Sequence, residues 1–124
     1  MGTAPRFFFT GFLFILIMIT GFVLSRTGRP YGTGIFTLHK LIGLAVFIFL
    51  MLSLYRWDVL TTPNGITFMV ALITCLFFIG VIVTGGIISA AQSVSPLVTL
   101  LHKILPWLTV GMTAVTFYLV ARQN

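Results

Sequence analysis

The sequence contains little charge and almost no acid. Only 6% of its 124 residues are charged, and Asp58 is the single acidic residue against seven lysines and arginines. Ordinary soluble domains are about 25% charged, and a small domain keeps a large part of its surface in water. Because 59% of the residues are apolar, a soluble enzyme is excluded, and so is a disordered chain, which needs low hydrophobicity. We therefore expect an integral membrane protein.

Three further absences narrow the function. Cys75 is the only cysteine, so the chain forms no internal disulfide and no cysteine-based zinc site. None of the long apolar runs contains a carboxylate, which disfavours a small proton-coupled exporter. The net charge of +6 comes from cations scattered singly near the ends of apolar runs, Arg6 among them. Such cations meet lipid headgroups, and no basic cluster typical of nucleic-acid binding is present.

Four apolar runs are long enough to cross a bilayer, which takes roughly 20 helical residues. They are Phe7–Leu24, Phe36–Tyr55, Ile66–Ser89 and Leu97–Ala121. We interpret the first as a retained span, because it is too long for the apolar part of a typical signal peptide. Turn residues interrupt the runs at 26–34, 58–65 and 93–96, and such short connections join antiparallel neighbours. The predicted fold is an all-α integral membrane four-helix bundle, with residues 1–124 as a single transmembrane domain made of two antiparallel hairpins.

The chain also repeats itself. Phe14-Ile15, Thr20-Gly21 and Ser25 recur 64 residues later, and Leu38-His39-Lys40-Leu41-Ile42 matches Leu101-His102-Lys103-Ile104-Leu105 at an offset of 63. We interpret this as an internal duplication with halves of about 1–62 and 63–124. Two hairpins with the same direction across the membrane form a parallel repeat, related by an axis near the membrane normal.

The only two histidines, His39 and His102, occupy matching positions in the repeat. Each is expected roughly one helical turn, some 6 Å, inside its span. Thr20-Gly21 and Thr84-Gly85 lie late in the first and third spans. We expect them at the same depth as the histidines. A b-type haem takes two axial imidazoles, and helix bundles build such sites from facing helices. Glycines leave room for a flat macrocycle, and the candidates are Gly21, Gly43, Gly85 and Gly86.

Four cations are expected at the same end of the molecule as the histidines. They are Arg26, Arg29, Lys40 and Lys103, and one or two of them are candidates to pair with anionic haem propionates near the headgroups. Pro106 follows His102 by four positions. It removes the backbone donor to the His102 carbonyl and is expected to bend the last helix.

The order of a Thr-Gly pair late in one span, a short polar loop and Leu-His-Lys-Leu-Ile-Gly early in the next resembles small membrane cytochrome b subunits of quinone-linked dehydrogenases and hydrogenases. The resemblance covers residues 19–43 and, more weakly, 83–105. It implies one haem b per chain with His39 and His102 as axial ligands of the iron, and a packing role for Gly21 and Gly85. It also implies an electron-transfer subunit that works with other redox subunits or a membrane quinone, in a prokaryotic-type inner membrane. The chain departs from the di-haem members, which carry about twice as many histidines.

Two other functions stay open at this stage, and so does the question of enzymatic activity. An amphipathic side chain one turn inside a span often lies at the membrane interface without binding anything. The chain is then a non-catalytic structural or assembly subunit of a larger membrane complex. A third interpretation is a quinone- or lipid-binding protein without haem.

Overall fold

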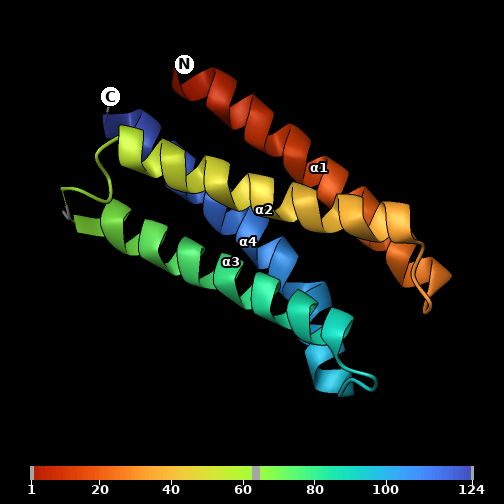
Figure 1. Cartoon of the computed structure of the whole chain (residues 1–124). Coiled ribbons are helices and arrows are strands. Elements are labelled where there is room, and N and C mark those ends of the chain that lie inside the picture. Colours follow the sequence, from red (N-terminus) through yellow and green to blue (C-terminus); the bar gives the residue numbers. More distant parts are fainter. Residues whose placement is uncertain (1, 63–64, 124) are drawn as a thin grey trace. The chain divides into compact units, whose positions relative to one another are not determined.

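The computed structural model describes residues 2–62 and 65–123. These residues form four helices and no strand, as Figure 1 shows: α1 (Thr3–Thr27), α2 (Thr33–Arg56), α3 (Gly65–Ala90) and α4 (Pro96–Gln123). All four are long and apolar enough to cross a membrane. The predicted class, an all-helical membrane protein with four spans, is confirmed.

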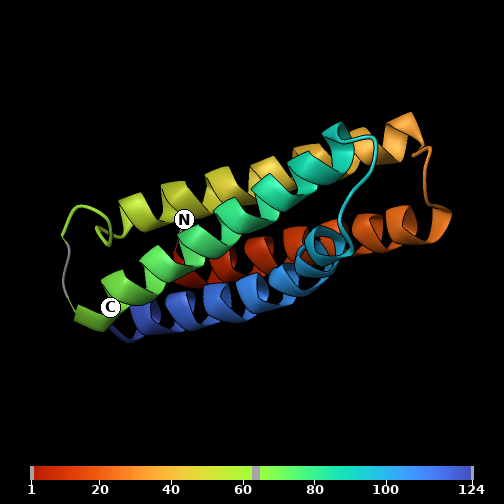
Figure 2. The ribbon, with the colours of Figure 1, turned by 90° about the horizontal axis from the view of Figure 1, so that it is seen from below.

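The helices pack in sequence-adjacent pairs. In both views α1 lies beside α2, and α3 lies beside α4 (Figures 1 and 2). The packing divides the chain into two units, Met1–Arg56 and Trp57–Asn124, which we call the first and the second hairpin. The division falls a few residues before the expected repeat boundary near residue 62. Trp57 belongs to the second hairpin because its ring packs edge-on against Phe117 of α4, with the ring centroids 5.1 Å apart.

The connections at the hairpin tips differ slightly from those expected. The first turn was expected over 26–34, but α1 continues to Thr27 and α2 already begins at Thr33. Gly28 ends α1 with a positive φ of 66°, and its N–H donates to the Leu24 carbonyl at 3.1 Å, as glycines do at helix C-termini. Pro106 lies inside α4, which continues on both sides of it. Membrane helices tolerate proline because neighbouring groups serve the freed carbonyl.

Large apolar side chains cover the outside of the helices. Phe8 is 76% exposed, Ile15 60% and Trp107 68%, as expected of surfaces that face lipid. The buried positions hold apolar side chains, the largest of them Phe117, Leu50 and Leu54. They also hold many small hydroxyl residues: Thr10, Thr20, Ser53, Thr67, Thr74, Thr84, Thr109, Thr113 and Thr116. Lipid tails are as apolar as leucine, so membrane helices associate through close packing of small residues and through hydrogen bonds rather than through the hydrophobic effect.

One of these hydrogen bonds joins the two helices of the second hairpin near their middle. The hydroxyls of Thr74 on α3 and Thr116 on α4 lie 3.0 Å apart and are fully buried. Each hydroxyl also contacts the carbonyl four residues before it in its own helix, at 2.8 Å. Two hydroxyls carry two hydrogens, so one donates across the pair while the other donates to the carbonyl of its own helix. The pair therefore fixes the register of α3 against α4.

We expect Thr74→Val and Thr116→Val to be coupled, because either change removes the same interhelical bond. A double-mutant cycle should give a coupling free energy of about 0.6 kcal/mol, and of no more than about 1.7 kcal/mol. Reversible unfolding of the protein in mixed micelles measures it. Thr109→Val is the control, since the Thr109 hydroxyl bonds to the Leu105 carbonyl of its own helix. Strictly additive effects of Thr74→Val and Thr116→Val would contradict this expectation.

Candidate functional site

The two histidines lie at equivalent places in the two hairpins. His39 follows the first residue of α2, Thr33, by six positions, and His102 follows the first residue of α4, Pro96, by six positions. At 1.5 Å per residue each lies about 9 Å inside its helix. This is deeper than the 6 Å expected from sequence, because both helices begin earlier than the apolar runs do.

In the first hairpin, Thr20 and Gly21 of α1 hold the His39 ring. The Thr20 hydroxyl lies 2.9 Å from His39 Nδ1. The imidazole packs directly on the α1 backbone at Gly21, where an added Cβ would lie 3.0 Å from Cε1 of the ring. Glycine at this position is therefore what allows the ring to reach the threonine.

The second hairpin repeats this arrangement with its own residues. The Thr84 hydroxyl of α3 lies 3.0 Å from His102 Nδ1, and a Cβ added at Gly85 would lie 2.9 Å from Cε1 of that ring. We call each set a Thr-Gly-His unit: Thr20, Gly21 and His39 in the first hairpin, and Thr84, Gly85 and His102 in the second. The helices of each hairpin meet at such a unit.

The threonine hydroxyl determines which nitrogen of the ring carries the proton. Thr20 Oγ1 lies 3.1 Å from the Leu16 carbonyl and 3.0 Å from the Ile17 carbonyl. A hydroxyl has one hydrogen, and these carbonyls can only accept it. When the hydrogen goes to one of these carbonyls, the oxygen accepts a hydrogen bond from the Nδ1–H of His39. A neutral imidazole protonated at Nδ1 carries its lone pair at Nε2.

The same reasoning holds for the second unit. Thr84 Oγ1 lies 2.8 Å from the Gly80 carbonyl and 3.0 Å from the Val81 carbonyl, so it also accepts from the ring nitrogen at Nδ1. Histidines that ligate metals usually donate one ring N–H to such an acceptor, which fixes the tautomer and the orientation of the ring. With a proton at Nδ1, the Nε2 of each ring carries the lone pair that a metal ligand needs.

The remaining glycines of the predicted site differ in their surroundings. A Cβ added at Gly43 would lie 3.0 Å from Cδ1 of Ile17 on α1, whereas one added at Gly86 would meet nothing within 4 Å. At Gly21, Gly43 and Gly85 the missing side chain thus makes room for a side chain of the same hairpin. For Gly21 and Gly85 that side chain is the histidine itself.

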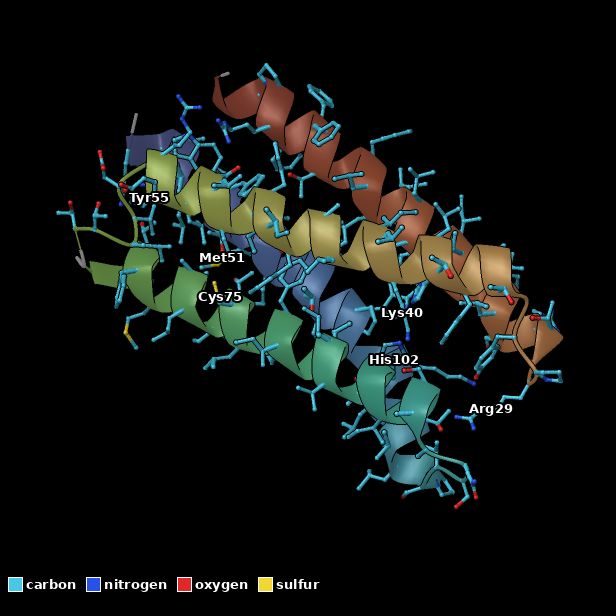
Figure 3. The ribbon with its side chains drawn as sticks, viewed as in Figure 1. Arg29, Lys40, Met51, Tyr55, Cys75 and His102 are labelled. Carbon is cyan, nitrogen blue, oxygen red and sulfur yellow. The ribbon has the colours of Figure 1, made fainter. Side chains whose placement is uncertain are left out.

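Of the four cations of the predicted site, Arg26 lies in the last turn of α1 and Arg29 in the connection between α1 and α2 (Figure 3). Lys40 on α2 and Lys103 on α4 directly follow the two histidines. Three of them lie over aromatic rings of the first hairpin: Arg26 over Phe22 at 5.4 Å, Arg29 over Tyr31 at 5.8 Å and Lys40 over Phe36 at 4.3 Å. Lys103 on α4 is exposed. Cation–π contacts at exposed sites are weak, about 0.5–1 kcal/mol, so these side chains keep their charge available to an anion.

Comparisons of the chain with protein-family models, with curated proteins and with solved structures give no match. Within residues 2–62 and 65–123, no three histidine, cysteine or acidic side chains gather in a way that holds a metal ion. The Thr-Gly-His units therefore remain the candidate site, on the geometry of the residues themselves. Sequence reasoning placed the Thr-Gly pairs at the depth of the histidines but did not give the threonines their role as acceptors from Nδ1.

We expect Gly85→Ala and Gly21→Ala to destabilise the protein by about 1–3 kcal/mol, the usual cost of an overpacked contact, because the new methyl collides with the imidazole. Gly86→Ala is the matched control, since the added methyl meets open space and alanine favours helix. Thermal unfolding of the three variants in one detergent measures the difference. Equal effects of Gly85→Ala and Gly86→Ala would show that the ring does not pack on Gly85.

Proposed function

We propose that the chain is a b-type haem-binding electron-transfer subunit of a membrane complex, with the imidazoles of His39 and His102 as the two axial ligands of one haem iron. The observation that carries the proposal is the pair of Thr-Gly-His units. Each hairpin supplies one imidazole whose Nδ1 is held by a threonine hydroxyl, at 2.9 Å and 3.0 Å. Two imidazoles with a lone pair at Nε2 are the donor set of a bis-histidine haem.

The residues of the chain have distinct tasks in this proposal. Thr20 and Thr84 would keep a proton at Nδ1 and so leave the lone pair of Nε2 for the iron, and the adjacent glycines let each ring lie against the helix. The exposed Lys103, together with Lys40, offers positive charge for the propionates. When bound, the haem supplies one-electron redox chemistry. Two histidines serve one haem only, so the chain passes electrons to or from a further redox subunit or a quinone.

The same contacts also favour a second candidate, a structural subunit without haem. In each hairpin the Thr–His hydrogen bond joins two helices, and such interhelical bonds stabilise membrane proteins by about 0.6 kcal/mol on average. The two candidates differ in what the histidine is for. In the structural candidate the ring is needed only for its Nδ1–H, and in the haem candidate its Nε2 is needed as well.

We expect the purified protein, expressed with haem supplied, to show the sharp α band of a low-spin b-type haem after reduction with dithionite, with haem approaching one per chain. His39→Ala and His102→Ala should each abolish that band, because one axial ligand is lost. Lys40→Ala removes a cation offered to the propionates but neither axial ligand, so the protein that binds haem should keep the band. A featureless visible spectrum of the wild-type protein would overturn the haem proposal and leave the structural subunit.

The threonines give a separate prediction. Thr20→Val and Thr84→Val remove the acceptor at Nδ1 without a change in size, and loss of such an outer partner usually weakens metal binding by about 10- to 100-fold. Thr→Ser at the same positions restores the hydroxyl and should restore most of the affinity, as measured by titration of the haem-free protein with haem. Thr113→Val is the control, since its hydroxyl bonds to the Thr109 carbonyl. Unchanged affinity in Thr20→Val and Thr84→Val would mean that the hydroxyls do not orient the ligands.

A further inference from the structure

The hairpins also match at a second polar layer, nearer their other ends. Thr10 of α1 corresponds to Thr74 of α3 at the offset of 64, and Ser53 of α2 corresponds to Thr116 of α4 at the offset of 63. In the second hairpin the two hydroxyls of this layer hydrogen-bond each other at 3.0 Å. By analogy, a hydrogen bond between Thr10 and Ser53 is expected in the first hairpin.

In the first hairpin Ser53 bonds to Arg6 and not to Thr10. Arg6 Nη1 donates to Ser53 Oγ at 2.8 Å, and the guanidinium lies over the Phe49 ring at 5.6 Å. Ser53 in turn donates to the Phe49 carbonyl at 2.8 Å. The second hairpin has Val70 at the position of Arg6, so nothing there competes with the bond between the hydroxyls.

Because Arg6 rather than Thr10 bonds to Ser53, the Thr10 hydroxyl has no partner within residues 2–62 and 65–123. Among the residues that the structure describes, its Oγ1 is the one buried side-chain nitrogen or oxygen without a hydrogen-bond partner, although Thr10 is only 2% exposed. Burying a hydroxyl without a partner costs about 1–3 kcal/mol. Arg6 and Thr10 lie one helical turn apart on the same face of α1, so both are placed to reach Ser53.

We infer that Arg6 is a binding residue for the phosphate of an anionic phospholipid, and that Thr10 replaces it at Ser53 when the phosphate is bound. Arg6 is only 5% exposed although it lies near the start of the span Ala4–Thr27. A long arginine side chain at such a position reaches the headgroups by extending along the helix. With the guanidinium on a phosphate, the Thr10 hydroxyl donates to Ser53, as in the Thr74–Thr116 pair.

Two features favour this exchange and this ligand. The exchange removes the cost of the unpaired Thr10 hydroxyl, which gains Ser53 as a partner, and it places the guanidinium on an anion, to which it bonds most strongly. The chain has seven lysines and arginines and one acidic residue, so it is strongly positive and attracts anions. In a bilayer these are the phosphates of acidic lipids, which attract arginines near the membrane surface.

The test is the effect of Thr10→Val on the thermal unfolding midpoint of the full chain in two kinds of vesicle. In phosphatidylcholine alone the change removes an unpaired buried hydroxyl, so the midpoint should stay equal or rise. In vesicles with phosphatidylglycerol the change removes the Thr10–Ser53 bond, so the midpoint should fall. Thr74→Val is the matched control and should lower the midpoint in both vesicles, because its bond does not depend on lipid. The measurement does not involve haem.

Two further measurements test whether Arg6 binds the anion and whether the anion must be a lipid. Phosphatidylglycerol should raise the midpoint of the wild-type protein by about 4 °C, and Arg6→Gln should lose most of that rise while Arg56→Gln keeps it. Inorganic phosphate added to phosphatidylcholine vesicles, against chloride at equal ionic strength, shows whether the free anion suffices. If Thr10→Val lowers the midpoint in phosphatidylcholine vesicles with added phosphate, as in phosphatidylglycerol vesicles, the site is supported with free phosphate as its ligand. If Thr10→Val acts with the same sign in all conditions, the exchange is wrong, whether or not Arg6→Gln folds.

Discussion

The hydrocarbon core of a membrane offers no hydrogen bonds, and this constraint explains most of the polar contacts in the chain. A polar side chain buried within a span is costly unless it finds a hydrogen-bond partner. The buried threonines of α3 and α4 meet this demand through carbonyls of their own helices and through Thr74 and Thr116 across the pair. The histidines meet it through threonines. The interior of each hairpin accordingly combines hydroxyl contacts with buried apolar side chains such as Leu50 and Phe117.

The similarity of the two hairpins gives the molecule an internal comparison. At one end, the Thr-Gly-His units agree in their partners and almost in their distances, 2.9 Å and 3.0 Å. Toward the other end the hairpins differ, since Arg6 stands where Val70 stands and only one hairpin keeps its hydroxyl pair. A feature kept in both halves indicates a shared task, and a feature changed in one half indicates a separate task. The histidine layer and the Arg6 layer therefore serve different purposes in our proposals.

Much of the fold could be predicted from the sequence, because span length and composition are set by bilayer thickness. The four helices and their pairing followed from this, and the depth shared by histidines and glycines followed from the repeat. The direction of the threonine hydroxyls did not, since it depends on rotamers that pattern cannot give. The burial of Arg6 was also missed. A cation near a span end was expected at the headgroups, and only the register of α1 against α2 brings its guanidinium to Ser53.

The distance along the chain from threonine to histidine is 19 positions in the first unit and 18 in the second, and yet the two contacts match. The difference of one residue therefore lies toward the tip of the hairpin, beyond the point where the helices are fastened. A segment on the far side of a fixed contact can change in length without disturbing what lies before it. The hairpin tips are thus the parts of the chain where insertions are best tolerated, and where the two halves are freest to acquire different surroundings while the histidine layer stays the same.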